Sequence, residues 1–158
     1  MSRKKKVLLG IVAALVIIQF IQIDHNKPEY DRSQSFEVIE QENDNMAIIV
    51  NACYDCHSYE TEYPWYTYIQ PVGWVIRGHI RGGRNKLNFS EWGALSQSDR
   101  EHKFHEMAEE IIEGVMPPKG FVGRHPEAVI SEKSQTELIQ WLRANSNWFQ
   151  LLNLAINF

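Results

Sequence analysis

The only two cysteines of this 158-residue chain stand three residues apart, and a histidine follows directly: Cys53, Tyr54, Asp55, Cys56, His57. On a helical turn, residues three apart share a face, so both thiols would point the same way. They could then add to the two vinyl groups at one edge of a porphyrin, and the adjacent imidazole could bind its iron. This spacing is the attachment signature of c-type haem. The motif predicts one covalent haem c, held by Cys53 and Cys56, with His57 as an iron ligand.

Three other readings of the cysteine pair are open. A thioredoxin-like C-x-x-C normally lies in a βαβ unit, which this sequence does not contain. A disulfide between Cys53 and Cys56 is chemically possible outside the cytoplasm, but it gives His57 no role. A zinc site could use Cys53, Cys56, His57 and one further His, but no second C-x-x-C or H-x-x-x-H pair stands at zinc-finger spacing. Haem uses all three residues and is the preferred interpretation.

Residues 7–23 form an uncharged, largely apolar run that follows four consecutive basic residues at positions 3–6. As a helix the run would be roughly 25 Å long, against a bilayer core of about 30 Å. No small-residue cleavage site of the A-x-A type ends it, so we expect a retained signal anchor rather than a cleaved signal peptide. The positive-inside rule then predicts a single-pass protein of the cytoplasmic membrane. Residues 24–158 would lie on its periplasmic or extracytoplasmic side.

The charge of the exported part disfavours nucleic acid as a partner. The chain has 16 basic and 20 acidic residues, and every acidic one follows residue 23. Residues 24–158 therefore hold 12 basic and 20 acidic side chains, a formal net charge of −8. A surface of that sign repels phosphate backbones.

The pattern beyond the apolar run predicts an all-α domain like a small cytochrome c, because no useful stretch alternates as a strand does. We expect a tether at 24–35, a haem-binding domain at 36–147 and an apolar tail at 148–158, too short to span a bilayer. Helices are predicted over 36–52 and from 131 or 134 to 144, with a short helical turn at 76–83 that Gly82 and Gly83 end. A further helix is predicted to begin at a capping box of Ser98 and Glu101 and to run to Met116.

Several later motifs stand in a fixed order behind the cysteine pair, at residues 53–58, 63–66, 83–92, 116–118 and 125–126. In this order they resemble the bacterial haem-binding domain family, over about residues 36–145. The resemblance implies a small, often membrane-anchored protein with a single c-type haem. Gly120, Gly123 and the tail after Asn147 depart from the family pattern. The resemblance implies the cofactor more firmly than a physiological role.

The sixth iron ligand has several candidates, of which Met116 is preferred. Pro117 and Pro118 fix its loop, and a thioether suits haem iron. His79 is the main alternative, followed by His125 or an open, five-coordinate iron. Met107 is expected to pack in the core, and His102 and His105 to be solvated. Met46 lies on the helix that leads into the motif, too close in sequence to cross the ring. By similarity to ordinary c-type cytochromes, the free N–H of His57 should donate to a carbonyl in the turn of Gln70 and Pro71.

Three arginines lie close in sequence to an aromatic segment, and haem propionates need such partners. Arg84 is the first choice because it falls within the family-like stretch, while Arg77 and Arg81 fit a solvated helix face equally well. Trp65 and Tyr66, with Trp74, are expected to line the haem edge, with plain core packing as the alternative.

These expectations together predict a membrane-tethered one-electron carrier, anchored through residues 7–23 and serving redox protein partners. The alternative is a haem-based sensor or ligand-binding module whose sixth position is open or weakly held. An enzyme such as a peroxidase is the third reading, because it needs an open distal site with an acid–base group.

Overall fold

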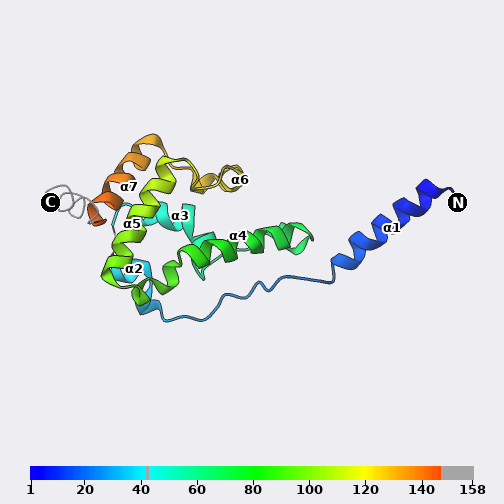
Figure 1. Ribbon diagram of the computed structural model, residues 1–158, viewed down its shortest axis with the longest axis horizontal. Helices are drawn as coiled ribbons and strands as arrows, with labels where there is room; N and C mark the ends of the chain where they lie inside the picture. Colours follow the sequence, from blue (N-terminus) through cyan, green and yellow to red (C-terminus); the bar gives the residue numbers. More distant parts are fainter. Residues whose placement is uncertain (42, 147–158) are drawn as a thin grey trace, which may run out of the picture.

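A computed structural model describes residues 1–41 and 43–146, and the regular secondary structure of this part of the chain is all helical, with no strand (Figure 1). The prediction of an all-α fold is confirmed. Short 3₁₀ turns connect the helices at Arg32–Gln34 (η1), Trp65–Tyr68 (η2), Phe89–Ala94 (η3) and Pro126–Ala128 (η4). The α-helices are α1 (Arg3–Ile18), α2 (Phe36–Ile39), α3 (Met46–His57), α4 (Val72–Lys86), α5 (Gln97–Ile112), α6 (Lys119–Val122) and α7 (Glu132–Asn145).

The core of the domain is built around Phe36, which is completely buried. Its ring lies 4.8 Å from that of Trp92 and 4.9 Å from that of Phe89, both edge-on. Helices α5 and α7 pack against each other and close the core with Phe104 and Leu138. The aromatic density gives a small domain a large buried apolar area.

Helix α5 begins earlier than its predicted cap. Ser96, not Ser98, caps it: the Ser96 hydroxyl accepts from the Asp99 amide at 3.2 Å and donates to the Asp99 carboxylate at 2.6 Å. The predicted box of Ser98 and Glu101 was wrong because Ser96 and Asp99 offer the same pattern one half-turn earlier. At its other end, α5 stops at Ile112 rather than at Met116, and Gly114 follows with a φ of +69°.

The helix predicted over 36–52 is two helices. Helix α2 ends at Ile39 and α3 begins at Met46. Asn43 explains the second boundary, because its side chain accepts from the Asn45 amide at 3.0 Å and its carbonyl accepts from the Met46 amide at 2.9 Å. Such a turn competes with a continuous helix.

Helix α4 is longer than the turn predicted at 76–83, and it runs through both Gly82 and Gly83. These glycines do not end the helix. Gly83 is instead where α4 crosses α3, since a Cβ there would lie 2.7 Å from the carbonyl oxygen of Cys56. Only glycine allows so close an approach of the two backbones.

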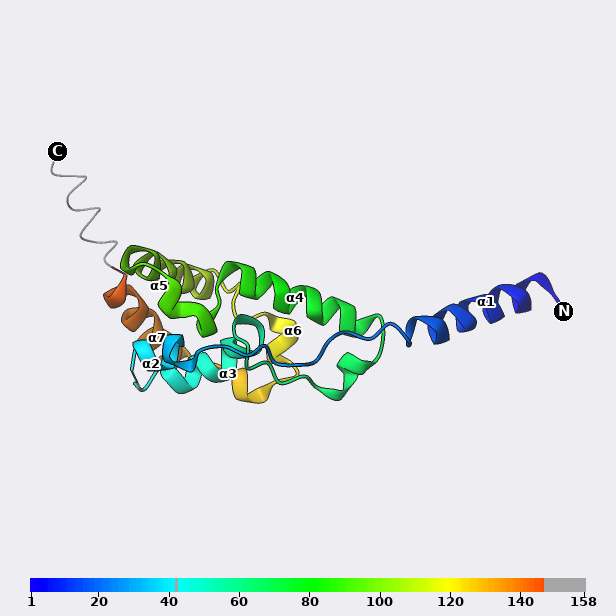
Figure 2. The same ribbon diagram turned by 90° about the horizontal axis from the view of Figure 1, so that it is seen from below.

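Helix α1 stands away from the domain, with none of its residues buried (Figures 1 and 2). The membrane-spanning helix predicted over 7–23 is not supported, because α1 ends at Ile18. Within residues 1–41 and 43–146, no helix combines the length and apolarity needed to cross a membrane. Just after α1, the Gln19 side chain contacts the domain: its Oε1 accepts from the Gln70 amide at 2.9 Å and its Nε2 donates to the Gln70 carbonyl at 3.0 Å.

The segment after α1 runs along the domain as extended chain (Figure 2). His25 stacks on Tyr68 with ring centroids 3.9 Å apart. Further along, Glu60 accepts from Lys27, Tyr30 and Arg32 at 3.0–3.1 Å. Residues 24–35, expected as a tether, therefore contact the domain near both ends of the stretch. The apolar tail expected at 148–158 lies outside the described residues.

Candidate functional site

The cysteine pair lies in the last turn of α3, where the helix ends with His57. Ile49 and Ala52 anchor α3 in the core, which leaves Cys53 and Cys56 half-buried, with free thiols, on one turn of the helix. The helix therefore holds both sulfur atoms on one side, as the spacing predicted.

Burial keeps both thiols in their protonated form. Desolvation, with a smaller effect of the Cys56 thiol, raises the pKa of Cys53 to about 12. Desolvation also raises the pKa of Cys56, ahead of the charge of Asp55. A thiol of this kind is a poor thiolate nucleophile or metal ligand at neutral pH. Among the described residues, no group of three or more His, Cys, Asp and Glu side chains is placed to hold a metal ion.

The imidazole of His57 is oriented by a backbone carbonyl. Its Nδ1 lies 3.1 Å from the carbonyl oxygen of Leu87, just after the end of α4. If Nδ1 carries the proton, Nε2 keeps its lone pair for a ligand. The prediction that the turn of Gln70 and Pro71 supplies this acceptor was wrong. The Gln70 carbonyl accepts from Gln19, and the full length of α4 brings Leu87 to His57 instead.

The environment of His57 favours the neutral imidazole. Burial lowers its pKa, and this outweighs the opposite effects of the carbonyls of Leu87 and Gly83 and of the Glu110 charge. A neutral ring with one nitrogen fixed and the other available is the form that binds iron. Two thiols on one side of a turn and this imidazole fit the donor set of a c-type haem.

The comparison with known families agrees with this donor set. The sequence model of the haem-binding domain family matches residues 13–144, well over half of the chain. The chain belongs to the haem-binding domain family. The resemblance stated from the sequence is confirmed. No curated protein and no solved structure matches this haem-binding domain.

Arg84 braces the chain immediately after the motif. Its Nε donates to the Ser58 carbonyl at 2.7 Å, its Nη2 donates to the Thr61 hydroxyl at 2.9 Å, and its guanidinium lies 5.1 Å above the ring of Tyr59. Sequence reasoning missed this contact with the loop, since nothing in the local pattern of residues shows it.

The loop that Arg84 grips is itself tied to α3. The Ser58 hydroxyl donates to the Tyr54 carbonyl at 2.8 Å, and the Thr61 hydroxyl donates to the Asp55 carbonyl at 2.6 Å. The Asp55 carboxylate accepts from the Glu62 amide at 2.9 Å. Satisfied carbonyls at the end of α3 hold the motif in one geometry.

Met116 is half-buried in the loop that follows α5. The amides of Val115 and Met116 both donate to the Glu110 carbonyl, at 3.0 and 3.1 Å. The charge of Glu110 also acts on His57. The start of the Met116 loop is therefore held by the last turns of α5.

The remaining candidates differ in exposure. His79 on α4 is exposed, and Trp65 is 73% exposed. Tyr66 is half-buried beneath the Arg124 guanidinium, 5.8 Å from its ring centroid. His125 stacks on Phe121 and its Nδ1 lies 2.9 Å from Glu127. The predicted core position of Met107 is confirmed, since it is buried, and Met46 is buried as well.

Proposed function

We propose that this chain binds one haem c covalently and transfers single electrons at the outer face of a cytoplasmic membrane. The observation that carries the proposal is the imidazole of His57, fixed through Nδ1 by Leu87 beside two free thiols, in a chain of the haem-binding domain family. When bound, haem supplies a one-electron couple at its iron. Redox proteins are the partners that such a carrier serves.

The cysteines and His57 hold the haem. The thiols of Cys53 and Cys56 would each hold one vinyl group as a thioether, by addition of S–H without loss of any atom. His57 Nε2 would bind the iron, and the carbonyl of Leu87 orients the ring for that role.

Met116 is the proposed sixth ligand. Met116 is half-buried, two prolines follow it, and its amide donates to the Glu110 carbonyl. These features support a loop stiff enough to present a thioether. His79 is the alternative ligand, and its exposure counts against it. A filled sixth position leaves no site for a substrate, so electron transfer is the chemistry that fits.

Other side chains are proposed to surround the group. Arg84 uses two of its five N–H donors in the loop contacts and keeps the rest for a propionate. Trp65 and Tyr66 offer aromatic rings to the haem edge.

The proposed membrane attachment rests on residues 7–23, which carry no charge and follow four basic residues. Large apolar side chains of this run are exposed, among them Leu8, Leu9, Ile17 and Phe20. Apolar surface of this extent needs a lipid or protein cover.

The haem proposal is tested by expressing the full chain with and without cytochrome c maturation proteins. Denaturing electrophoresis with haem staining should show haem on the wild type only with maturation, and none on C53A/C56A. Attachment of residues 7–23 is tested by alkaline extraction of membranes, in which the chain should stay in the pellet. An unstained wild-type chain made with maturation proteins would refute covalent attachment.

A further inference from the structure

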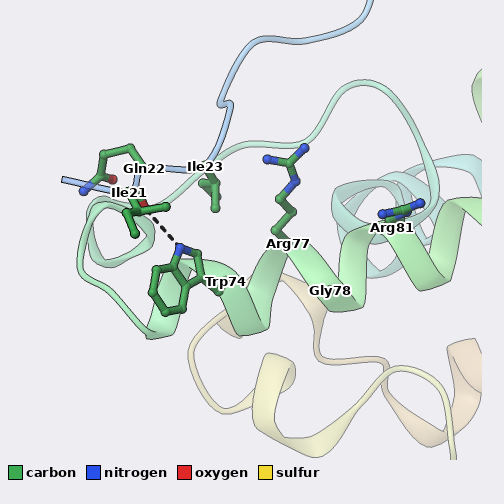
Figure 3. Close-up of a pocket in the computed structure, with 7 residues that line it drawn as sticks. All are labelled: Ile21, Gln22, Ile23, Trp74, Arg77, Gly78 and Arg81. Atoms are coloured by element: carbon green, nitrogen blue, oxygen red, sulfur yellow. Dashed lines mark hydrogen bonds between the residues drawn. The ribbon is translucent and has the colours of Figure 1, made fainter. Parts of the chain in front are cut away.

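A hollow of about 300 Å³ lies where the chain leaves α1 and meets α4 (Figure 3). None of Cys53, Cys56 and His57 lines it. Its walls are Ile21, Gln22 and Ile23 on one side and Trp74, Arg77, Gly78 and Arg81 on the other. That volume is at the lower end for a site that binds a small molecule or a head group, about 300–1,000 Å³.

The two arginines of the hollow are free to bind an anion. Arg77 and Arg81 are one helical turn apart, and both are exposed (Figure 3). Within residues 1–41 and 43–146, neither makes a hydrogen bond, ion pair or ring contact, and no acidic residue lines the hollow. Like charges four residues apart on a helix destabilise each other, so a bound anion would relieve a repulsion. Arginine forks match phosphate oxygens.

These arginines lie on a different side of α4 from the cysteine pair. A helix turns 100° per residue, so Arg81 and Arg77 lie about 160° and about 120° around α4 from Gly83, the residue that faces Cys56. The hollow is therefore separate from the cysteine pair.

The surroundings indicate where the anion comes from. Trp74 closes the hollow by donating its Nε1 proton to the Ile21 carbonyl at 2.9 Å. At the same end of the domain, next to the end of α1, exposed aromatic and aliphatic side chains gather: Trp65, Tyr68, Ile69, Val72, Trp74 and Val75. Tryptophan and tyrosine are enriched where a protein meets the head groups of a bilayer.

We infer that Arg77 and Arg81 bind the phosphate of a phospholipid head group, with Trp74 at the glycerol level. The inference rests on the proposed membrane attachment of residues 7–23. Such a contact fixes the orientation of the haem domain above the bilayer, because it adds a second anchoring point to the apolar run.

The test counts bound lipids on the full, haem-loaded chain in non-ionic detergent by native mass spectrometry. The probes are phosphatidylglycerol, a diacylglycerol with the same acyl chains, and inorganic phosphate. The R77Q/R81Q variant is compared with K119Q/K133Q, which removes the same charge from exposed sites outside the hollow.

Wild type and K119Q/K133Q should retain one phosphatidylglycerol at least about tenfold more tightly than R77Q/R81Q, and none should retain the diacylglycerol. Equal retention of phosphatidylglycerol by R77Q/R81Q would overturn the inference. Displacement of the lipid by an equimolar amount of inorganic phosphate would overturn its lipid source in favour of a soluble anion.

The result of the lipid-binding test can be distinguished from that of the membrane-attachment test, because lipid binding in detergent does not depend on insertion of residues 7–23. A chain that pellets with membranes while R77Q/R81Q keeps its lipid overturns the head-group site alone. A chain that is extracted at high pH but retains phosphatidylglycerol through its arginines overturns only the proposed anchor.

Discussion

Gly83→Ala tests whether the close crossing of α3 and α4 positions the haem site. An added Cβ would lie 2.7 Å from the Cys56 carbonyl oxygen and 3.2 Å from its carbon. These are backbone atoms of the motif itself, so they cannot swing away as a side chain would. One helix must move, and overpacking of this kind costs about 1–3 kcal/mol.

Gly82→Ala is the matched control in the same helix. A Cβ at Gly82 meets nothing within 4 Å. Alanine should therefore give only the helix-propensity gain of about 0.5–1 kcal/mol. Both substitutions carry that gain, so the difference between them isolates the contact with Cys56 at about 1–3 kcal/mol.

The assay is guanidinium unfolding of the haem-loaded protein, followed by circular dichroism. G83A should unfold at lower denaturant than wild type, and G82A at equal or higher denaturant. G83A should also perturb the visible spectrum, because the Leu87 amide donates to the Gly83 carbonyl at 2.9 Å and Leu87 in turn holds His57. If G83A were as stable as G82A and spectrally unchanged, the crossing would not constrain the site.

Three further predictions follow from the site and its surroundings. Met116→Ala should remove the long-wavelength sulfur-to-iron absorption band of the oxidised form and allow the reduced form to bind carbon monoxide. Carbon monoxide binding by the reduced wild type would support the sensor function instead. Arg84→Lys should lower stability by about 1–3 kcal/mol in urea unfolding, because lysine lacks the fork that reaches Ser58 and Thr61, while Lys86→Gln on the exposed side of α4 should have little effect. The pKa of Glu60 is lowered because Lys27, Tyr30 and Arg32 outweigh its burial. Its ion pairs therefore stabilise the extended segment above the ordinary pKa of 4.5 and are lost as the pH falls through the lowered value. Limited proteolysis of residues 24–35 should accelerate over that acidic range in wild type, and E60Q should be cleaved quickly at every pH.

The parts of the molecule that the sequence predicted are those set by local spacing. The cysteine pair lies on one helical turn because three residues make nearly a full turn. The apolar repeats of α5 and α7 predicted two buried faces, and Phe104, Met107 and Leu138 are buried on them. These patterns depend on residues near one another in the chain.

The start of α5 shows a limit of local patterns. Ser96 with Asp99 and Ser98 with Glu101 both satisfy the capping-box pattern, and only tertiary packing decides between them. The end of α1 shows another, since the side chain of Gln19 bonds to the backbone of Gln70, which is 51 residues away.

The orientation of His57 could not be predicted, because a backbone carbonyl provides it. Every residue offers a backbone carbonyl as an acceptor, so nothing in the side chain of Leu87 marks it as the partner of His57. Its location depends on α4 continuing through Gly82 and Gly83, a pair that by propensity alone predicts a helix end. Gly83 is required by the close contact with Cys56, and α4 continues past it to Leu87. Gly83 therefore lies at the crossing of the helices and on the helix that brings the acceptor to His57.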